Sequence, residues 1–199
     1  MTGAVPGRSR VRREPQETSS QVAVIGFGNV FMGDDGVGVE VIENLEAGNI
    51  GGEVEFVIGG AASMANIRYF LKSRLVIVVD AIAAGARPGD IFRFHPDEAG
   101  VTGLRSNNIH GMGVGYLLTT ARLRGACPEV IIFGIQVGDV RPNDRQLTPA
   151  VAAAAGRVQA LVLEEIRSWH KQWRRNGGPA ASSSNKAKGA RHDDLPRSF

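Results

Sequence analysis

Continuous runs of apolar residues, separated by segments of helical periodicity, constrain the fold of this chain most strongly. Strands of a parallel sheet that is covered on both faces have this composition, because neither face meets water. The clearest run, RLVIVVDAI, spans residues 74–82 and is rich in β-branched residues. A shorter segment, DIFRFHP, alternates in character and suits the edge of a sheet. We predict strands at residues 22–28, 53–60, 74–82, 90–96 and 129–138.

Segments of helical periodicity lie between these strands, at residues 35–48, 63–73, 113–125 and 150–175. In the second of them, Met64, Ile67 and Leu71 share one face and are predicted to point inward. Thr148 and Pro149 suit the N-cap and first position of the last helix. Repeated strand–helix units predict a doubly wound fold. We expect a single-domain three-layer α/β/α structure with a twisted, mainly parallel sheet, phosphorylase/hydrolase-like.

Both ends of the chain lack the composition of a folded core. We therefore predict a flexible N-terminal arm at residues 1–20, one domain at 21–175 and a disordered basic C-terminal tail at 176–199. Of the 23 basic and 20 acidic residues, ten basic and four acidic ones lie before residue 21 or after residue 173, so the body holds 13 against 16. A nucleic-acid-binding domain carries its basic patch on the folded surface, so we expect no nucleic-acid partner.

The sequence also predicts a cytoplasmic location. Cys127 is the only cysteine, which rules out an internal disulfide and suits a reducing compartment. Its place before a predicted strand favours a structural role over a nucleophilic one. The arginines of the first 20 residues are not followed by an apolar stretch, so we expect no secretory signal. No apolar run approaches the roughly 20 residues of a membrane span, so we expect no membrane insertion.

The glycine-rich loop GFGNVFMGDDGVG, which follows the first predicted strand, raises the possibility of a nucleotide site. The dinucleotide fingerprint G-x-G-x-x-G needs a third glycine where this chain has Phe31. Ile58 occupies the region where a ribose-binding acid is expected, and its side chain accepts no hydrogen bond. The carboxylates of Asp34 and Asp35 would repel a pyrophosphate. The loop therefore argues against a nucleotide cofactor and favours a positively charged ligand.

Three residues form a candidate metal site. Asp35 lies in the glycine loop, Asp80 ends the most apolar strand, and His110 begins a helix after a polar segment. Ligands of open α/β sheets bind beyond the carboxyl ends of the strands, where all three residues are expected. An O/O/N ligand set suits a borderline divalent ion such as nickel or zinc. The alternatives are that Asp34 and Asp35 serve the dipole of the first helix, with Asp35 opening it, and that His110 is an ordinary loop or core residue.

Four ordered blocks of the sequence resemble the hydrogenase maturation proteases, the endopeptidases that finish [NiFe]-hydrogenase large subunits. The first three blocks are VIGFGNVFMGDDGVGVEVIENL, VIVVDAIAAGARPGDIFRF and IHGMGVGYLLTTARLRGACPEVIIFGIQVGDV. The fourth is LTPAVAAAA, and the resemblance covers roughly Val22 to Trp173. It implies a twisted, mainly parallel sheet between helices, and a substrate that is a hydrogenase large-subunit precursor.

The resemblance carries a metal-binding and catalytic role to Asp35, Asp80 and His110. It implies that the nickel is contributed by the precursor and that one peptide bond near the C-terminus is cut after nickel insertion. If the metal polarises the scissile carbonyl or activates a water, Asp34 or Asp35 is a candidate base. The nucleophile stays undecided at this stage. We expect a monomer, because one sheet and its helices account for the apolar residues.

The sequence departs from the family pattern at two places. The family often has Asp-Gly-Gly-Thr after the second strand, where this chain has Ile58-Gly59-Gly60-Ala61, and the residue after the histidine is commonly Gln, where this chain has Gly111. The lost polar groups affect the expected choice of substrate. They also motivate an alternative, a non-catalytic nickel-sensing assembly partner of a hydrogenase on the same fold.

Overall fold

A computed structural model describes residues 21–48, 54–60, 64–96 and 109–178, and for residues 109–112 it describes the backbone alone. The strands of these residues form one five-stranded sheet in the order β2-β1-β3-β5-β4. Their bounds are β1 (Val22–Phe27), β2 (Val54–Gly60), β3 (Leu75–Ile82), β4 (Ile91–Phe94) and β5 (Glu129–Gln136). All neighbouring pairs are parallel except β4 and β5, which are antiparallel. The predicted mainly parallel sheet with a short edge strand is confirmed.

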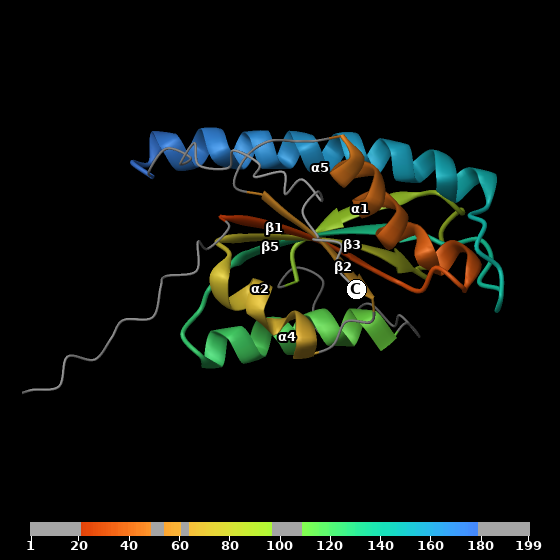
Figure 1. The fold of residues 1–199 in the computed structure, drawn as a ribbon, viewed down its shortest axis with the longest axis horizontal. Helices are drawn as coiled ribbons and strands as arrows, with labels where there is room; N and C mark the ends of the chain where they lie inside the picture. The colour runs from red at the N-terminus through yellow and green to blue at the C-terminus, as the bar shows by residue number, and fades with distance from the viewer. Residues whose placement is uncertain (1–20, 49–53, 61–63, 97–108, 179–199) are drawn as a thin grey trace, which may run out of the picture.

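Helices cover both faces of the sheet. The pair α1 (Val37–Ala47) and α5 (Pro149–Arg175) lies on one face, and α2 (Ile67–Lys72) and α4 (Ile109–Leu123) lie on the other (Figure 1). This arrangement confirms the predicted three-layer α/β/α fold. None of the helices in the described part of the chain is long and apolar enough to cross a membrane.

The central strands separate two hydrophobic cores. Every residue of β1 and β3 is buried, and successive side chains point to opposite faces of the sheet. Val24 and Ile77 pack into the core beneath α1 and α5. Ile25 and Val78 pack into the core above α2 and α4. The apolar runs seen in the sequence are continuous because each face of these strands meets a helical layer.

The second helix differs in part from the sequence prediction: Ile67 and Leu71 pack against the core as predicted, but Met64 does not. A short 3-10 turn, η2 (Met64–Asn66), precedes α2, so the helical periodicity begins only at Ile67. Tyr69 and Phe70 are the buried side chains of α2, whereas Met64 is 41% exposed. The prediction that Met64 points inward was therefore wrong, because it extended the helix by one turn.

The first turns of α1 and α5 differ from the sequence prediction in what Asp35 and the Thr148 side chain do. A 3-10 turn, η1 (Gly33–Gly36), precedes α1, which begins at Val37. Asp35 therefore lies in this turn and does not open the helix. Thr148 is the N-cap of α5 and Pro149 its first residue, as predicted, but the Thr148 side chain makes no capping hydrogen bond to its own helix.

Candidate functional site

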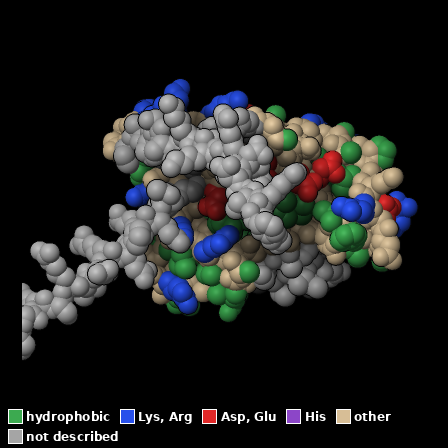
Figure 2. Space-filling view, in the orientation of Figure 1, with side chains coloured by type: hydrophobic (Ala, Val, Ile, Leu, Met, Phe, Trp, Pro, Cys, Tyr) green, Lys and Arg blue, Asp and Glu red, His purple; other side chains and the backbone are tan. Residues whose placement is uncertain are grey.

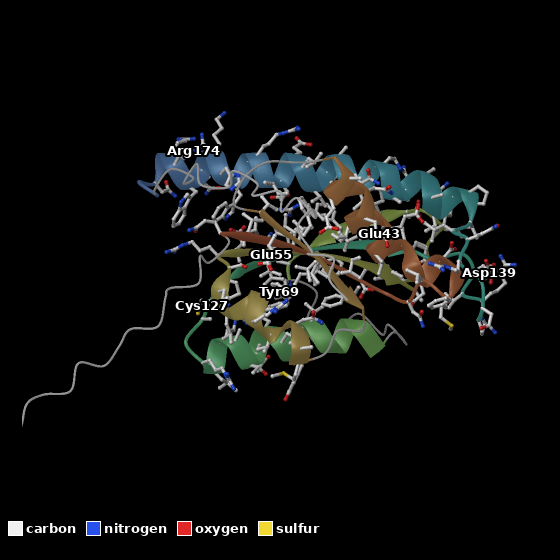
Figure 3. The ribbon with its side chains drawn as sticks, viewed as in Figure 1. Glu43, Glu55, Tyr69, Cys127, Asp139 and Arg174 are labelled. Atoms are coloured by element: carbon white, nitrogen blue, oxygen red, sulfur yellow. The ribbon has the colours of Figure 1, made fainter. Side chains whose placement is uncertain are left out.

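The loops that follow β1, β3 and β5 meet at one edge of the sheet. Asp139, in the loop after β5, lies at this edge, whereas Cys127 and Arg174 lie at the opposite end of the molecule (Figure 3). Ligands of parallel α/β folds bind beyond the carboxyl ends of the strands. The site is therefore built from the loop after β1, the end of β3 and the loop between β5 and α5.

Glycine shapes the loop after β1. Gly28 has φ +133°, in the region that side chains rarely adopt, and a Cβ there would lie 1.9 Å from the carbonyl oxygen of Asp35. Only a residue without a side chain lets the chain turn back this closely. The interpretation of the glycines as supports of a tight loop that presents acidic residues is consistent with this geometry.

Asp80 is a buried carboxyl group near the end of β3. Its residue is 4% exposed, and burial raises the pKa of the carboxyl to about 8. The negative charge of Asp35 raises the pKa further, whereas a hydrogen bond from the Ala81 N–H, 2.9 Å from Oδ1, lowers it. Because η1 packs against β3, Asp35 and Asp80, predicted from separate segments, lie close enough for their charges to interact.

Asp35 differs from Asp80 in its exposure. It lies in η1 and is partly exposed, so a ligand can reach it from solvent. Its Oδ2 accepts a hydrogen bond from the Asn29 N–H at 2.9 Å. This bond closes the loop and fixes the carboxylate at the edge of the sheet.

The structure places the backbone of His110, the third predicted ligand, as the second residue of α4. Its side chain lies outside the described residues. Among the side chains that are described, no group of three His, Cys, Asp or Glu residues is placed to hold a metal ion. The structure thus brings together Asp35 and Asp80, and the role of His110 stays a prediction.

Asp34 has a structural role that the sequence did not reveal. Its carboxylate is fully buried, and Oδ1 accepts a hydrogen bond from the Thr148 N–H at 2.6 Å. Oδ2 accepts from the backbone N–H groups of Gly138 and Asp139, at 2.8 and 2.9 Å, and from the Thr148 hydroxyl at 3.0 Å. Asp34 therefore ties η1 to the loop after β5 and to the first turn of α5.

These contacts change the choice between the two candidate bases. Both oxygens of Asp34 are occupied by donors, so this carboxylate is poorly suited to accept a proton from a water. The partly exposed Asp35 is better suited to do so. The sequence signal for the tether was the hydroxyl of Thr148, which its place before Pro149 assigned to helix capping. Its observed partner, Asp34, lies 114 residues away in the chain.

Asp35 and Asp80, which we call the acidic pair, have the chemistry to bind a cation. Two carboxylates in a partly buried environment repel each other, and burial of Asp80 disfavours its ionised form. A divalent ion held by Asp35 and Asp80 would offset both costs, and Asp80 would bind it in its ionised form. Oxygen ligands with an added imidazole suit a borderline divalent ion. An anionic ligand would add to the repulsion.

The departure from the family pattern lies at the end of β2, within the strand itself, and leaves an apolar group at the surface. Ile58 is 52% exposed, whereas Val57 beside it is buried. A Cβ on Gly59 would meet the ring of Phe27 at 2.6 Å, so this glycine keeps the strand close to β1. Ala61 lies outside the described residues, and Gly111 lies in the first turn of α4.

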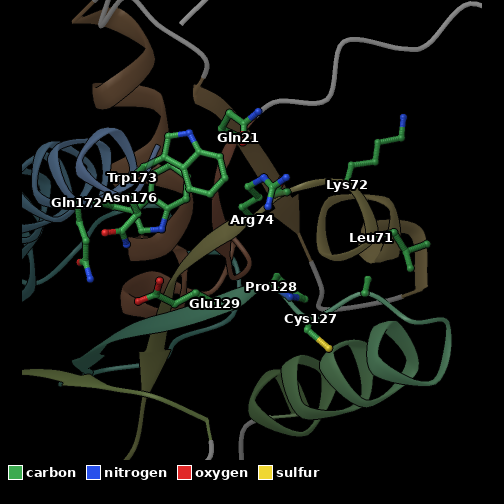
Figure 4. A pocket seen from close by; sticks show the side chains of 13 residues that line it. Gln21, Leu71, Lys72, Arg74, Cys127, Pro128, Glu129, Gln172, Trp173 and Asn176 are labelled. Atoms are coloured by element: carbon green, nitrogen blue, oxygen red, sulfur yellow. The ribbon is translucent and has the colours of Figure 1, made fainter. Parts of the chain in front are cut away.

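A pocket of about 520 Å³ lies at the opposite end of the sheet, before the amino ends of β1, β3 and β5 (Figure 4). Arg74 lies over the ring of Trp173, 4.4 Å from its centroid, and that ring stacks on Trp169. Cys127 lines the same pocket and is exposed. The thiol is therefore separated by the length of the sheet from Asp35 and Asp80, in agreement with its predicted place before a buried strand.

Comparison with known proteins gives a consistent result. A family model described as hydrogenase maturation protease matches residues 39–165. The hydrogenase expression/formation protein HupD of Rhodobacter capsulatus is 28% identical over 158 residues, which cover 78% of this chain and 75% of that protein. A putative hydrogenase maturation protease of Methanocaldococcus jannaschii is 29% identical over 153 residues, which cover 73% and 96%.

Solved structures show the same likeness. The hydrogenase maturating endopeptidase HybD from Escherichia coli superimposes with a TM-score of 0.66 at 26% identity, over 74% of this chain and 93% of that one. The hydrogenase 3 maturation protease superimposes with a TM-score of 0.58 at 28% identity, over 71% and 88%.

Proposed function

The chain belongs to the hydrogenase maturation protease family, and we propose that it recognises nickel in its substrate through Asp35, Asp80 and His110. It is an endopeptidase that processes a hydrogenase large subunit. The alternative of a non-catalytic assembly partner is not favoured. The proposal adds that the enzyme removes a C-terminal extension after nickel insertion, that the precursor contributes the metal, and that the enzyme acts as a cytoplasmic monomer.

The pairing of Asp80 with Asp35 carries this proposal. A buried carboxyl with a pKa raised to about 8 is costly to ionise, and a second carboxylate beside it increases that cost. Such pairs are concentrated at functional sites. A negatively charged site attracts the nickel centre of the precursor. A metal-free precursor lacks that positive charge and is attracted less.

The residues of the chain have separate roles in the proposed reaction. Asp80 and His110 bind the nickel that the precursor carries and thereby orient the adjoining peptide segment. Asp35 contributes to the same site and accepts a proton from the attacking water. The water oxygen adds to the scissile carbonyl carbon, the C–N bond breaks, and the leaving amine takes up the proton that Asp35 accepted. Asp34 takes no part in this proton transfer, because its oxygens hold the surrounding loops.

The test measures the intact mass of a nickel-loaded large-subunit precursor before and after incubation with the enzyme. We expect loss of one C-terminal fragment with the wild type, and none from nickel-free precursor. Asp35→Asn, Asp80→Asn and His110→Ala should each slow processing by about 100-fold or more, the scale for loss of one preorganised contact at a reacting group. Glu43→Gln removes an exposed carboxylate on α1 and should process normally.

The outcomes separate the parts of the proposal. Unchanged processing by the three site variants would refute the assignment of the residues. Equal processing of nickel-loaded and nickel-free precursor would refute recognition of the metal. Melting temperatures close to the wild-type value, or above it for Asp80→Asn, show that a loss of processing does not reflect unfolding.

A further inference from the structure

An exposed surface beside the acidic pair consists of Phe31, Val140 and Arg145, and we call it the loop surface. Phe31 is 54% exposed and Val140 is 43% exposed. The guanidinium of Arg145 lies over the Phe31 ring, 4.9 Å from its centroid. Hydrophobic, basic and acidic side chains gather at this end of the molecule, at the right of Figure 2. Aromatic and arginine side chains of this kind dominate the energetics of protein interfaces.

Backbone contacts join the two loops that form this surface. The N–H of Gly33 donates to the carbonyl of Asp144 at 2.8 Å, and the N–H of Asp34 donates to the carbonyl of Asp139 at 3.1 Å. Met32 and Asp144 form an isolated parallel β-bridge. Together with the hydrogen bonds of the Asp34 carboxylate, these contacts hold the loops in one arrangement. A surface that is already ordered loses little conformational entropy when a partner binds.

Hydrogen bonds also connect the loop surface to the proposed metal ligand. The Asn29 N–H donates to Oδ2 of Asp35 at 2.9 Å, and Oδ1 of Asn29 accepts from the Phe31 N–H at 3.0 Å. Asn29 therefore fixes the backbone of Phe31 relative to the carboxylate of Asp35. A protein that brings its metal to Asp35 comes close to Phe31 as well.

The geometry points to the loop surface as a docking site for the large-subunit precursor, separate from the groups that carry out hydrolysis. An apolar side chain of the precursor, close in its folded structure to the nickel site, packs against Phe31 and Val140. Arg145 pairs with an acidic or carbonyl group beside that side chain. Isolated exposed apolar residues are common on protein surfaces, and Leu161 on α5 is one, at 38% exposed. Phe31 and Val140 differ from it in lying on ordered loops beside the acidic pair.

This inference rests on the proposed function, and its test separates the two. Initial rates of processing are measured over a range of nickel-loaded precursor concentrations, so that kcat and KM are obtained independently. Phe31→Ala and Val140→Ala should each raise KM, and Phe31→Ala by about tenfold or more, the scale of an interface hot spot. The value of kcat should stay within about twofold of the wild type. Leu161→Ala, a matched exposed site on α5, should change neither.

Binding to the precursor is measured in parallel with the slow Asp35→Asn variant. Adding Phe31→Ala to that variant should weaken binding by a similar factor. Unchanged KM and unchanged binding in the Phe31→Ala and Val140→Ala variants would overturn the docking site while leaving the proposed function intact. An equal rise in KM for Leu161→Ala would also overturn it. Phe31→Leu, which keeps an apolar group but loses the aromatic ring, should fall between the wild type and Phe31→Ala.

Discussion

Asp80 couples function to stability at the scale of a single residue. Its carboxyl group is buried at the end of β3, and burial with the nearby charge of Asp35 raises its pKa to about 8. An aspartate in an unfolded chain has a pKa of about 3.9. The folded metal-free protein therefore binds this proton more tightly than the unfolded chain does. Stability from this group is fully present below about pH 3.9 and is lost as the pH rises through about 8.

The first prediction concerns Asp80→Asn in protein kept free of metal with a chelator. Between the two pKa values, each pH unit removes about 1.4 kcal/mol of the contribution of this group to the free energy of unfolding. The asparagine variant lacks this loss, so its melting temperature should exceed that of the wild type at pH 8 and approach it towards pH 4. Thermal unfolding followed by circular dichroism across this range provides the measurement. Parallel pH profiles for the two proteins would contradict the raised pKa.

The second prediction concerns the tether at Asp34. Thr148→Val removes the hydroxyl that donates to Oδ2 of Asp34 and should lower the free energy of unfolding by about 1.5–3 kcal/mol, the range for a hydrogen bond to a charged group. Asp34→Ala should cost more, because three backbone N–H groups lose their acceptor. Urea unfolding measures both changes. Thr119→Val, at an exposed position of α4, is the control and should have little effect. Equal changes in Thr148→Val and Thr119→Val would argue against the tether.

The sequence predicts the position of a side chain best when a strand or a local motif determines that position. Asp80 ends a continuous apolar run, and Asp35 lies in a glycine loop after another, so the rule for parallel sheets brought them to the same edge. The tether of Asp34 was missed because its donors are 104 to 114 residues away in the chain. No local pattern contains that information. His110 stays a prediction.

At the scale of elements, the sequence predicted strands and layers well and helix starts less well. β1 and β3 are buried on both faces, so their composition alone identifies them. Short 3-10 turns precede α1 and α2: η1 carries the acidic residues that are typical of a helix start, and Met64 in η2 extends the apolar spacing of α2. Periodicity therefore cannot separate the turn from the helix, and the side chain of Met64 was placed inside when it lies outside.

The third prediction tests the close contact between α1 and the sheet. A Cβ on Gly38 would lie 2.2 Å from the carbonyl oxygen of Phe27 and 2.5 Å from that of Val79, and neither backbone atom can move easily. Gly38→Ala should therefore destabilise the protein, although alanine favours a helix by about 1 kcal/mol over glycine. Gly156→Ala on α5 meets nothing within 4 Å and should stabilise by up to that amount. Chemical denaturation of both variants gives the comparison, and stabilisation by Gly38→Ala would contradict the packing.

At the scale of the whole molecule, the two ends of the sheet have different tasks. The carboxyl end holds Asp35, Asp80 and the loop surface, and its loops are joined to one another through Asp34. The amino end holds the pocket beside Trp173, which is lined by Cys127. The central strands β1 and β3 run from one end to the other, so the length of the sheet separates the two ends. A reaction at one end should therefore be insensitive to chemistry at the other.

The fourth prediction uses Cys127 to test this separation. The thiol is exposed and is the only one in the chain, so iodoacetamide should label a single position. Alkylated enzyme should process the nickel-loaded precursor at the wild-type rate, because the label lies at the amino end of β5 and the acidic pair at the carboxyl end of β3. Cys127→Ser should behave in the same way and resist labelling. If alkylation stopped processing and Cys127→Ser removed that sensitivity, the amino end would take part in binding the precursor. If a folded Cys127→Ser variant were itself inactive, the amino end would be needed for processing, and the separation of the two ends would be wrong.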